Sequence, residues 1–176
     1  MDTTLMGDKP EFELLDGEAF RKVSPVRTHS MVQRAVGDII ARSARGIGQA
    51  GPEWRFRVGL ADGSNTSLMP DVSYVSLERL RELRQEDREE PPFGPDIVAE
   101  VRSPSHRPGL LKRKIAKYFG AGTLMVLDID PQSRRIFAHT PKGMCEYGPG
   151  SRFAHPDTPW LIFEVDALFT EVDIFG

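Results

Sequence analysis

The sequence contains little that would crosslink the chain or place it in a membrane. Its single cysteine, Cys145, excludes an internal disulfide and a zinc site built from several thiolates. No run approaches the roughly 20 apolar residues that a membrane-spanning helix needs. Residues 1–8 lack the basic and apolar stretches of a secretory signal. We therefore expect a cytoplasmic protein with no membrane partner.

Several common catalytic motifs are missing as well. The chain has no Gly-x-Ser-x-Gly, no Walker-type phosphate loop and no His-Glu-x-x-His, which argues against serine hydrolases, P-loop nucleotidases and zinc proteases. Residues 46–51 have glycines spaced as in a dinucleotide-binding loop, but they follow a predicted helix instead of a strand. The remaining candidates are sites built from acids and bases.

The composition is that of a globular protein, with 28% charged and 39% hydrophobic residues in 176. This length fits one domain over residues 1–176. The net charge of −3 is weak evidence against a nucleic-acid-binding protein, which needs local positive charge. Acids crowd into 78–90, however, whereas 102–117 contains six basic residues and no acid. A local basic face therefore remains open.

Apolar periodicity and turn residues predict the elements of the fold. An Asp-Gly turn indicates a hairpin over 11–23, and Thr28 is the expected cap of a helix that extends to 44. Further helices are predicted over 77–88 and 110–119, with strands over 54–60, 71–75, 97–101, 124–129, 135–139, 144–147 and 161–165 and a C-terminal segment over 167–175. This order predicts an α/β (α+β) fold with a mixed central sheet flanked by helices.

Two acids stand in apolar, strand-like surroundings. Asp71 follows Pro70 and precedes Val72, and Glu100 lies within Ile97–Val101. A buried carboxylate is costly unless it is paired, hydrogen-bonded or bound to a metal. Carboxylates on adjacent strands can hold a hard divalent cation. Asp71 on a solvated edge strand is the alternative, whereas Glu100 is harder to explain without a function.

Basic residues follow Glu100 closely. Lys114 borders the apolar face of its predicted helix, so it could orient a water or neutralise a phosphate, or it could extend into solvent. Arg102 lies two residues after Glu100 on the same strand face, where it could hold a phosphate or form a salt bridge with Glu100 or Asp71. Glu18 and His29 are weaker candidates, and Asp96 is interpreted as a turn acid at the entry to a strand.

Several short motifs recur here in the order of a known family. They are Phe12–Glu18, Thr28–Ser30, Pro70–Val72, Pro95–Ser105, Lys114-x-x-x-Tyr118, Gly122 and Asp128-x-Asp130-Pro131. Together they resemble the putative restriction-endonuclease family, the Uma-type branch of the PD-(D/E)xK nuclease superfamily. Glu-Val-x-Ser-Pro-Ser followed by Lys-x-x-x-Tyr is the most specific part of the resemblance, which spans nearly the whole chain.

The resemblance implies a restriction-endonuclease-like fold, a Mg²⁺ (or Mn²⁺) cofactor and hydrolysis of phosphodiester bonds in DNA. Asp71 and Glu100 correspond to the metal-binding acids, with the Val101 carbonyl as a further ligand, and Lys114 corresponds to the motif lysine, which in this branch lies on the helix after the strand. Two departures stand out: Arg102 replaces a commonly aliphatic residue, and Thr123–Val126 replaces a Glu-Tyr-Trp pattern.

These observations predict a metal-dependent endodeoxyribonuclease with Asp71, Glu100 and Lys114 as catalytic residues and Arg102, Glu18 and His29 as accessory ones. The alternative is a catalytically silent nucleic-acid-binding or interaction module that keeps the fold, which Arg102 beside Glu100 would favour. A structural subunit of a larger complex and a homodimer both remain open.

Overall fold

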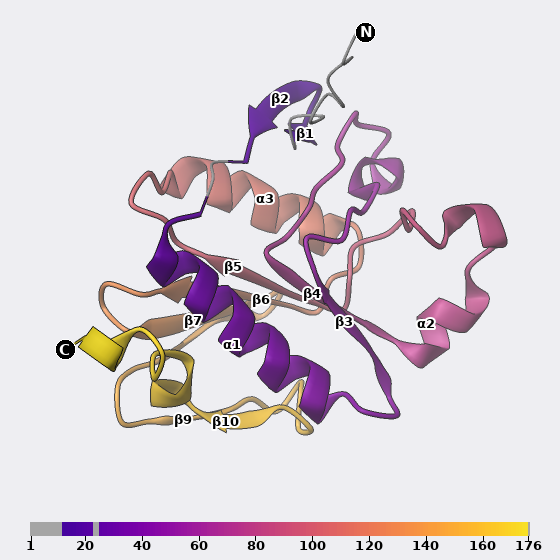
Figure 1. The fold of residues 1–176 in the computed structure, drawn as a ribbon. Helices are drawn as coiled ribbons and strands as arrows, with labels where there is room; N and C mark the ends of the chain where they lie inside the picture. Colours follow the sequence, from indigo (N-terminus) through magenta and orange to yellow (C-terminus); the bar gives the residue numbers. More distant parts are fainter. Residues whose placement is uncertain (1–11, 23–24, 176) are drawn as a thin grey trace, which may run out of the picture.

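A six-stranded mixed sheet lies at the centre of the structure, a computed structural model that describes residues 12–22 and 25–175 (Figure 1). In spatial order its strands are β3 (Gly48–Pro52), β4 (Val72–Ser76), β5 (Ile97–Val101), β6 (Met125–Asp130), β7 (Arg135–Thr140) and β8 (Gly143–Tyr147). β5 and β6 run parallel and are joined by helix α3 (Pro108–Gly120), whereas the other neighbouring pairs are antiparallel. The predicted mixed sheet flanked by helices is confirmed.

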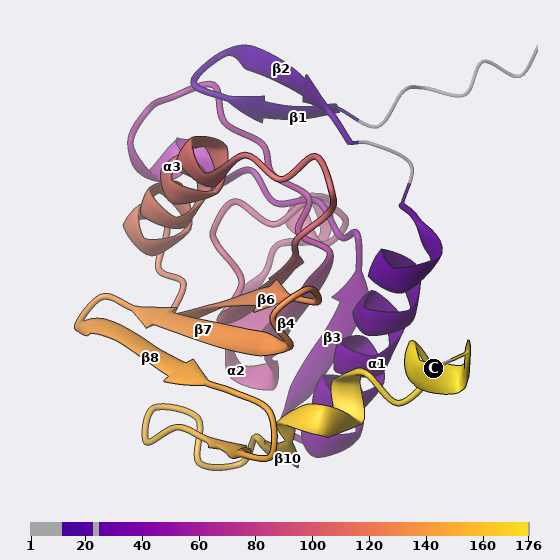
Figure 2. The ribbon, with the colours of Figure 1, turned by 90° about the vertical axis from the view of Figure 1, so that its left-hand side faces the viewer.

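The two faces of the sheet are covered by different helices. Helix α1 (Arg27–Ser43) and α3 lie on opposite sides of the sheet in Figure 2. Because side chains alternate along β5, Ile97, Ala99 and Val101 join the core under α1, while Val98 packs with Tyr118 of α3. Glu100 shares the α3 face with Val98, so the face on which the predicted acid lies is fixed by the packing of its apolar neighbours.

The N-terminal hairpin is a separate two-stranded sheet on the α3 side of the molecule (Figure 2). Its strands are β1 (Phe12–Leu15) and β2 (Glu18–Arg21). Asp16 and Gly17 form the turn with φ values of 53° and 81°, the left-handed conformation that a two-residue hairpin turn requires. The predicted hairpin is confirmed, but its ends at 11 and 23, like residues 1–8, lie outside the described residues.

Helix ends differ from the prediction at two places. Val26 is the N-cap of α1 and Thr28 lies inside the first turn, so the predicted Thr28 cap is wrong. The predicted helix over 77–88 is shorter: α2 (Leu77–Glu82) is followed by a single 3₁₀ turn at Gln85–Asp87. It ends there because Leu83 adopts an extended conformation, and this residue is buried.

The predicted strand over 54–60 is also wrong. Phe56 makes only an isolated bridge to Leu68, and Val58–Ala61 forms a 3₁₀ helix. The edge strand beside β4 is instead the glycine-rich β3, where a Cβ atom on residue 48 would lie 2.2 Å from the Tyr74 ring and 2.5 Å from the Val75 carbonyl oxygen, so that position requires glycine. Glycine is unfavourable in most strands, but it allows this close approach of two backbones.

The C-terminal part of the chain packs beside α1. β9 (Arg152–Ala154), which the sequence did not predict, pairs with β10 (Ile162–Glu164) in a second two-stranded sheet. The 3₁₀ helices at Val165–Leu168 and Asp173–Phe175 follow, and Figure 2 shows them next to α1. Among the helices that the structure describes, none has the length and apolar character needed to cross a bilayer.

Asp96 supplies a test of the fold that is separate from the pocket. Its buried carboxylate accepts hydrogen bonds from the Ser76 backbone N–H at 2.7 Å and from Arg79 at 2.8 Å. Asp96→Ala should therefore lower the free energy of unfolding by about 1–3 kcal/mol, because a buried N–H loses its acceptor. Urea unfolding measures the loss. Asp157→Ala, which removes an exposed pair with Lys142, should change the stability by less than about 0.5 kcal/mol. Equal losses in the two variants would contradict this role.

Candidate active site

Three neighbouring strands each contribute an acid to the α3 face of the sheet. Val72 pairs with Ala99, so the same register continued by one residue places Asp71 opposite Glu100. Glu100 in turn pairs with Asp128 of the parallel strand β6. Residues in register lie on the same face of a sheet. Asp71, Glu100 and Asp128 therefore form a row across β4, β5 and β6, and each acid has its own cationic partner.

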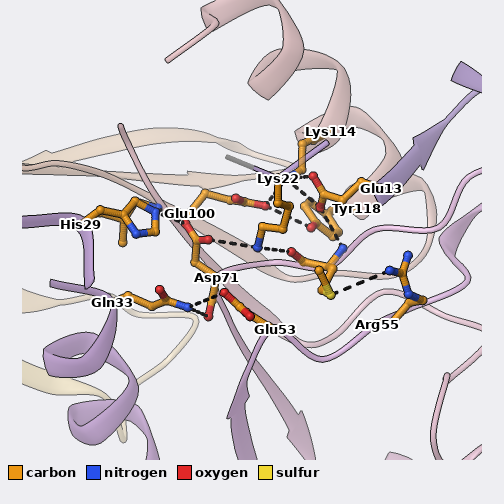
Figure 3. Close-up of polar contacts among 12 residues, drawn as sticks. Glu13, Lys22, His29, Gln33, Glu53, Arg55, Asp71, Glu100, Lys114 and Tyr118 are labelled. Carbon is orange, nitrogen blue, oxygen red and sulfur yellow. Dashed lines mark hydrogen bonds and ion pairs between the residues drawn. The ribbon is translucent and has the colours of Figure 1, made fainter. Parts of the chain in front are cut away.

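Asp71 lies immediately before β4 and is buried. Its Oδ1 lies 3.1 Å from Lys22 Nζ, and its Oδ2 lies 3.1 Å from His29 Nε2 and accepts the Val101 N–H at 2.8 Å (Figure 3). Burial raises the pKa of Asp71, but the contacts with His29 and Lys22 and the Val101 N–H outweigh it and hold the pKa well below its usual range. His29, predicted as an accessory residue, thus contacts the proposed metal-binding acid.

Glu100 is the acid whose ionisation is most opposed by its surroundings. Lys114 Nζ lies 2.6 Å from its Oε1, and the Tyr118 hydroxyl donates to the same oxygen at 3.1 Å. Burial raises the pKa of Glu100 to about 7; the Lys114 charge opposes this rise, while the negative charge of Asp71 adds to it. A carboxyl group near half-ionisation at neutral pH is typical of functional sites.

Lys114 is buried between two carboxylates and does not extend into solvent, which was the alternative interpretation. Its ammonium group lies 2.6 Å from Glu100 and donates to Glu13 at 3.1 Å, as Figure 3 shows. Burial lowers the pKa of Lys114, but the charges of Glu100 and Glu13 outweigh it and raise the pKa above its usual value. Lys114 is therefore a cation at neutral pH, able to donate hydrogen bonds but not to accept a proton.

The hairpin contributes two residues that the sequence analysis missed. Glu13 of β1 contacts Lys114 and accepts the Met69 N–H at 2.8 Å. Lys22, just after β2, contacts Asp71 and donates to the Met69 carbonyl at 2.7 Å. The signal was the alternation of the hairpin, since Glu13 pairs with Phe20 and Lys22 follows two residues later on the same face.

Glu18, by contrast, is not placed at the site. Its side chain is 62% exposed and lies 3.4 Å from Arg113, outside the pocket. The structure therefore does not bring Glu18 together with the other predicted site residues, and its accessory role stays a prediction. It sits at the turn end of the hairpin, where β2 begins and Glu18 pairs with Leu15.

Arg102 lies at the edge of the site but contacts neither predicted metal-binding acid. It forms a bidentate pair with Asp128 at 2.8 and 2.7 Å and reaches Asp130 at 3.4 Å. Its guanidinium group also lies over the Phe137 ring, 4.9 Å from the centroid. The expected salt bridge of Arg102 with Glu100 or Asp71 is wrong in its partner, because the third acid of the row is within closer reach.

The row of acids opens into a pocket of about 770 Å³. Asp71, Glu100 and Lys114, which lie up to 43 positions apart in sequence, all line it. One wall is the hairpin segment 19–22, and the opposite wall is the loop 102–107 with the first turns of α3. The structure thus brings the three predicted catalytic residues together in one concave pocket, while their chemical roles remain predictions.

The oxygen atoms at this site fit a hard divalent cation. Within residues 12–22 and 25–175, no three His, Cys, Asp or Glu side chains are grouped as a ready metal cluster. Mg²⁺ does not need such a cluster, because it keeps several waters and is commonly held by one or two carboxylates together with substrate phosphate. Asp71 and Glu100 are two such carboxylates; burial raises the pKa of Glu100 and the negative charge of Asp71 adds to the rise, and a bound cation would favour its ionised form.

Comparison with known proteins places the chain among nuclease-like sequences. The sequence model of Uma2, described as "Putative restriction endonuclease", matches residues 2–165. A solved structure described as a putative nuclease belonging to DUF820, from Anabaena variabilis, aligns with a TM-score of 0.79 and 23% identity. The alignment covers 92% of this chain and 90% of that one, and at this identity it shows the fold. No curated protein matches the chain significantly.

The raised pKa of Glu100 predicts a dependence of stability on pH. The folded protein keeps the Glu100 proton up to about pH 7, whereas the unfolded chain releases it near 4.5. Between these values the folded state binds more protons, so its free energy of unfolding falls as the pH rises. In Glu100→Gln the free energy of unfolding should fall less over this pH range than in the native protein. In Glu164→Gln, which changes an exposed side chain of β10, it should fall as in the native protein. Urea unfolding from pH 4.5 to 7.5 in EDTA measures it. Parallel curves for Glu100→Gln and the native protein would refute the assignment.

Proposed function

The chain belongs to the Uma2 family of putative restriction endonucleases, and from this premise we propose that it is a metal-dependent endonuclease that hydrolyses phosphodiester bonds of DNA. The observation that carries the proposal is the buried group of Asp71, Glu100 and Lys114 in one pocket. A nuclease must bring a cation, a water and a phosphate together, and this group offers oxygen ligands and a cation side by side.

Asp71 and Glu100 are the residues that would hold Mg²⁺ or Mn²⁺, with the Val101 carbonyl as a further ligand. The ion would supply Lewis acidity, which polarises the phosphate and lowers the pKa of a bound water. The protein holds Asp71 ready for this role: His29, Lys22 and the Val101 N–H keep its carboxylate ionised and fix its orientation. The Tyr118 hydroxyl donates to one oxygen of Glu100 and so fixes the orientation of that side chain.

Lys114 is proposed to act as a hydrogen-bond donor. Because its pKa is raised, it remains protonated and can stabilise the charge that develops on the phosphate or orient the attacking water. Glu13 holds the ammonium group from the side opposite to α3, so the lysine is positioned by the hairpin as well as by its own helix. Glu13 is in this sense a positioning residue.

A catalytically silent module with the same fold is the competing proposal. The silent module was suggested by Arg102 beside Glu100, because an arginine paired with the metal-binding acids would block the cation. Arg102 is engaged with Asp128 and Asp130 and leaves Glu100 and Asp71 to other partners. This arrangement supports the active enzyme over the silent module.

The first functional prediction concerns the two acids. Mg²⁺ or Mn²⁺ should support cleavage of DNA, and EDTA should abolish it. Asp71→Asn and Glu100→Gln should each lower the rate by at least about 100-fold, because each removes a charged ligand without leaving a cavity. Gel assays of plasmid and oligonucleotide substrates measure the rate, and exposed Glu164→Gln serves as the matched control. Cleavage that survives in both site variants would rule out this site.

The second functional prediction separates the lysine from the acids. Lys114→Met should lose activity by a similar factor but bind Mg²⁺ at least as tightly as the native protein, because a positive charge beside the cation is removed. Isothermal titration measures the binding, and circular dichroism checks that the helix remains folded. Lys117→Met, one turn further along α3 and paired with Asp16 and Asp62 on the surface, is the control. Loss of Mg²⁺ binding in Lys114→Met would place the lysine in a structural role.

A further inference from the structure

An aromatic ring stands on the wall of the pocket beside the acids. Phe20 of β2 lines the pocket and is half-buried. It pairs directly with Glu13 in the hairpin, so both side chains point to the same face, and Lys22 shares that face two residues later. The ring is thereby held by the same two strands that position Glu13 and Lys22 at the site. The mechanism proposed above does not use Phe20.

The rest of the lining is mixed rather than purely charged. Leu110 and Leu111 of α3 line the pocket together with Phe20, and Arg21 and Arg107 line it as well. Neither arginine forms an ion pair with another residue that the structure describes, whereas Lys22, Lys114 and Arg102 are all paired with acids. The pocket thus combines apolar and aromatic surface with two cations that have no such acidic partner.

This combination matches one nucleotide of an unpaired strand. Stacking on an aromatic ring recognises the face of a base, and arginines attract the backbone. A volume of about 770 Å³ lies in the range of pockets that enclose small molecules. Resting on the nuclease function proposed above, we propose that the substrate is unpaired DNA, with the base next to the scissile phosphate stacked on Phe20.

The depth of the acids favours an unpaired strand over a continuous duplex. The side chains of Asp71, Glu100 and Lys114 are only 6%, 12% and 8% exposed, so a phosphate must enter between the hairpin and the loop 102–107 to reach them. In a duplex, both faces of each base are covered by its neighbours, and a wall residue such as Phe20 meets no free face. An unpaired strand exposes its bases at no further cost.

The test compares three substrates with Mg²⁺ or Mn²⁺: a fluorescent single-stranded oligonucleotide, the same sequence as a duplex, and bis(4-nitrophenyl) phosphate, which has no base. The native protein should cleave the single strand faster than the duplex. Phe20→Ala should raise KM for the single strand by roughly tenfold, the effect of one lost stacking contact, and the loss should be smaller for the base-free diester. Phe20→Trp should restore the native KM, and Phe20→Leu, which keeps an apolar side chain, should not.

Phe12 provides the matched control, because it belongs to the same hairpin but does not line the pocket. Phe12→Ala should keep the native KM for the single strand. The substrate assignment is overturned if the duplex is cleaved as fast as the single strand, or if Phe20→Ala and Phe12→Ala behave alike.

Binding distinguishes a failure of the substrate assignment from a failure of the proposed function. Fluorescence anisotropy with the Glu100→Gln protein and Mg²⁺ measures the affinity for both oligonucleotides without cleavage. In one outcome the protein binds the single strand preferentially, Phe20→Ala weakens this binding, and the native protein cleaves neither substrate with any metal. This outcome supports the pocket as a binding site and refutes the nuclease function. Cleavage without any preference for unpaired DNA supports the nuclease and refutes the role of Phe20.

Discussion

The burial of three carboxylates side by side on one face of the sheet is the constraint on which the site depends. A buried charge is tolerated only when it is paired and hydrogen-bonded. Asp71, Glu100 and Asp128 lie on adjacent strands, and the elements around them each supply a partner: Lys22 from the hairpin, Lys114 and Tyr118 from α3, His29 from α1 and Arg102 from the end of β5. The helices and the hairpin that pack around these three acids therefore each bring a side chain that neutralises or hydrogen-bonds a carboxylate.

The charges do not balance completely in the inner pocket. Glu13, Asp71 and Glu100 contact Lys22 and Lys114, three acids against two lysines. The contacts with His29 and Lys22 lower the pKa of Asp71, whereas burial raises the pKa of Glu100 to about 7 and the charges of Asp71 and Glu13 add to this rise. Asp128 stands apart, because Arg102 binds it through two nitrogens. Asp128 is thus the acid that arginine stabilises, whereas Asp71 and Glu100 remain available to a cation.

Local patterns in the sequence predicted those parts of the fold and site that depend on local physics. The apolar run Ile97–Val101 and the amphipathic segment that became α3 were identified from periodicity, and with them Glu100 and Lys114. Glu13 and Lys22 were missed because the alternation of the hairpin places them on one face but does not say where that face docks. The docking is a tertiary contact, which no spacing in the sequence records. The strand over 54–60 was predicted wrongly for the converse reason: its alternation is real, but the segment that pairs with β4 is Gly48–Pro52, whose residues show no apolar alternation.

The hairpin has one further consequence for the entry of substrate. It forms its own two-stranded sheet, and its contacts with the rest include the Leu14–Ser67 bridge, ion pairs of the turn with α3, and the side chains of Glu13 and Lys22. Those two side chains carry opposite charges. If the hairpin swings away as a unit, one positive and one negative charge leave together, and the net charge of the inner pocket stays the same. Opening of the pocket and the net charge of its inner residues are therefore separate properties. Either one can change during evolution without a change in the other.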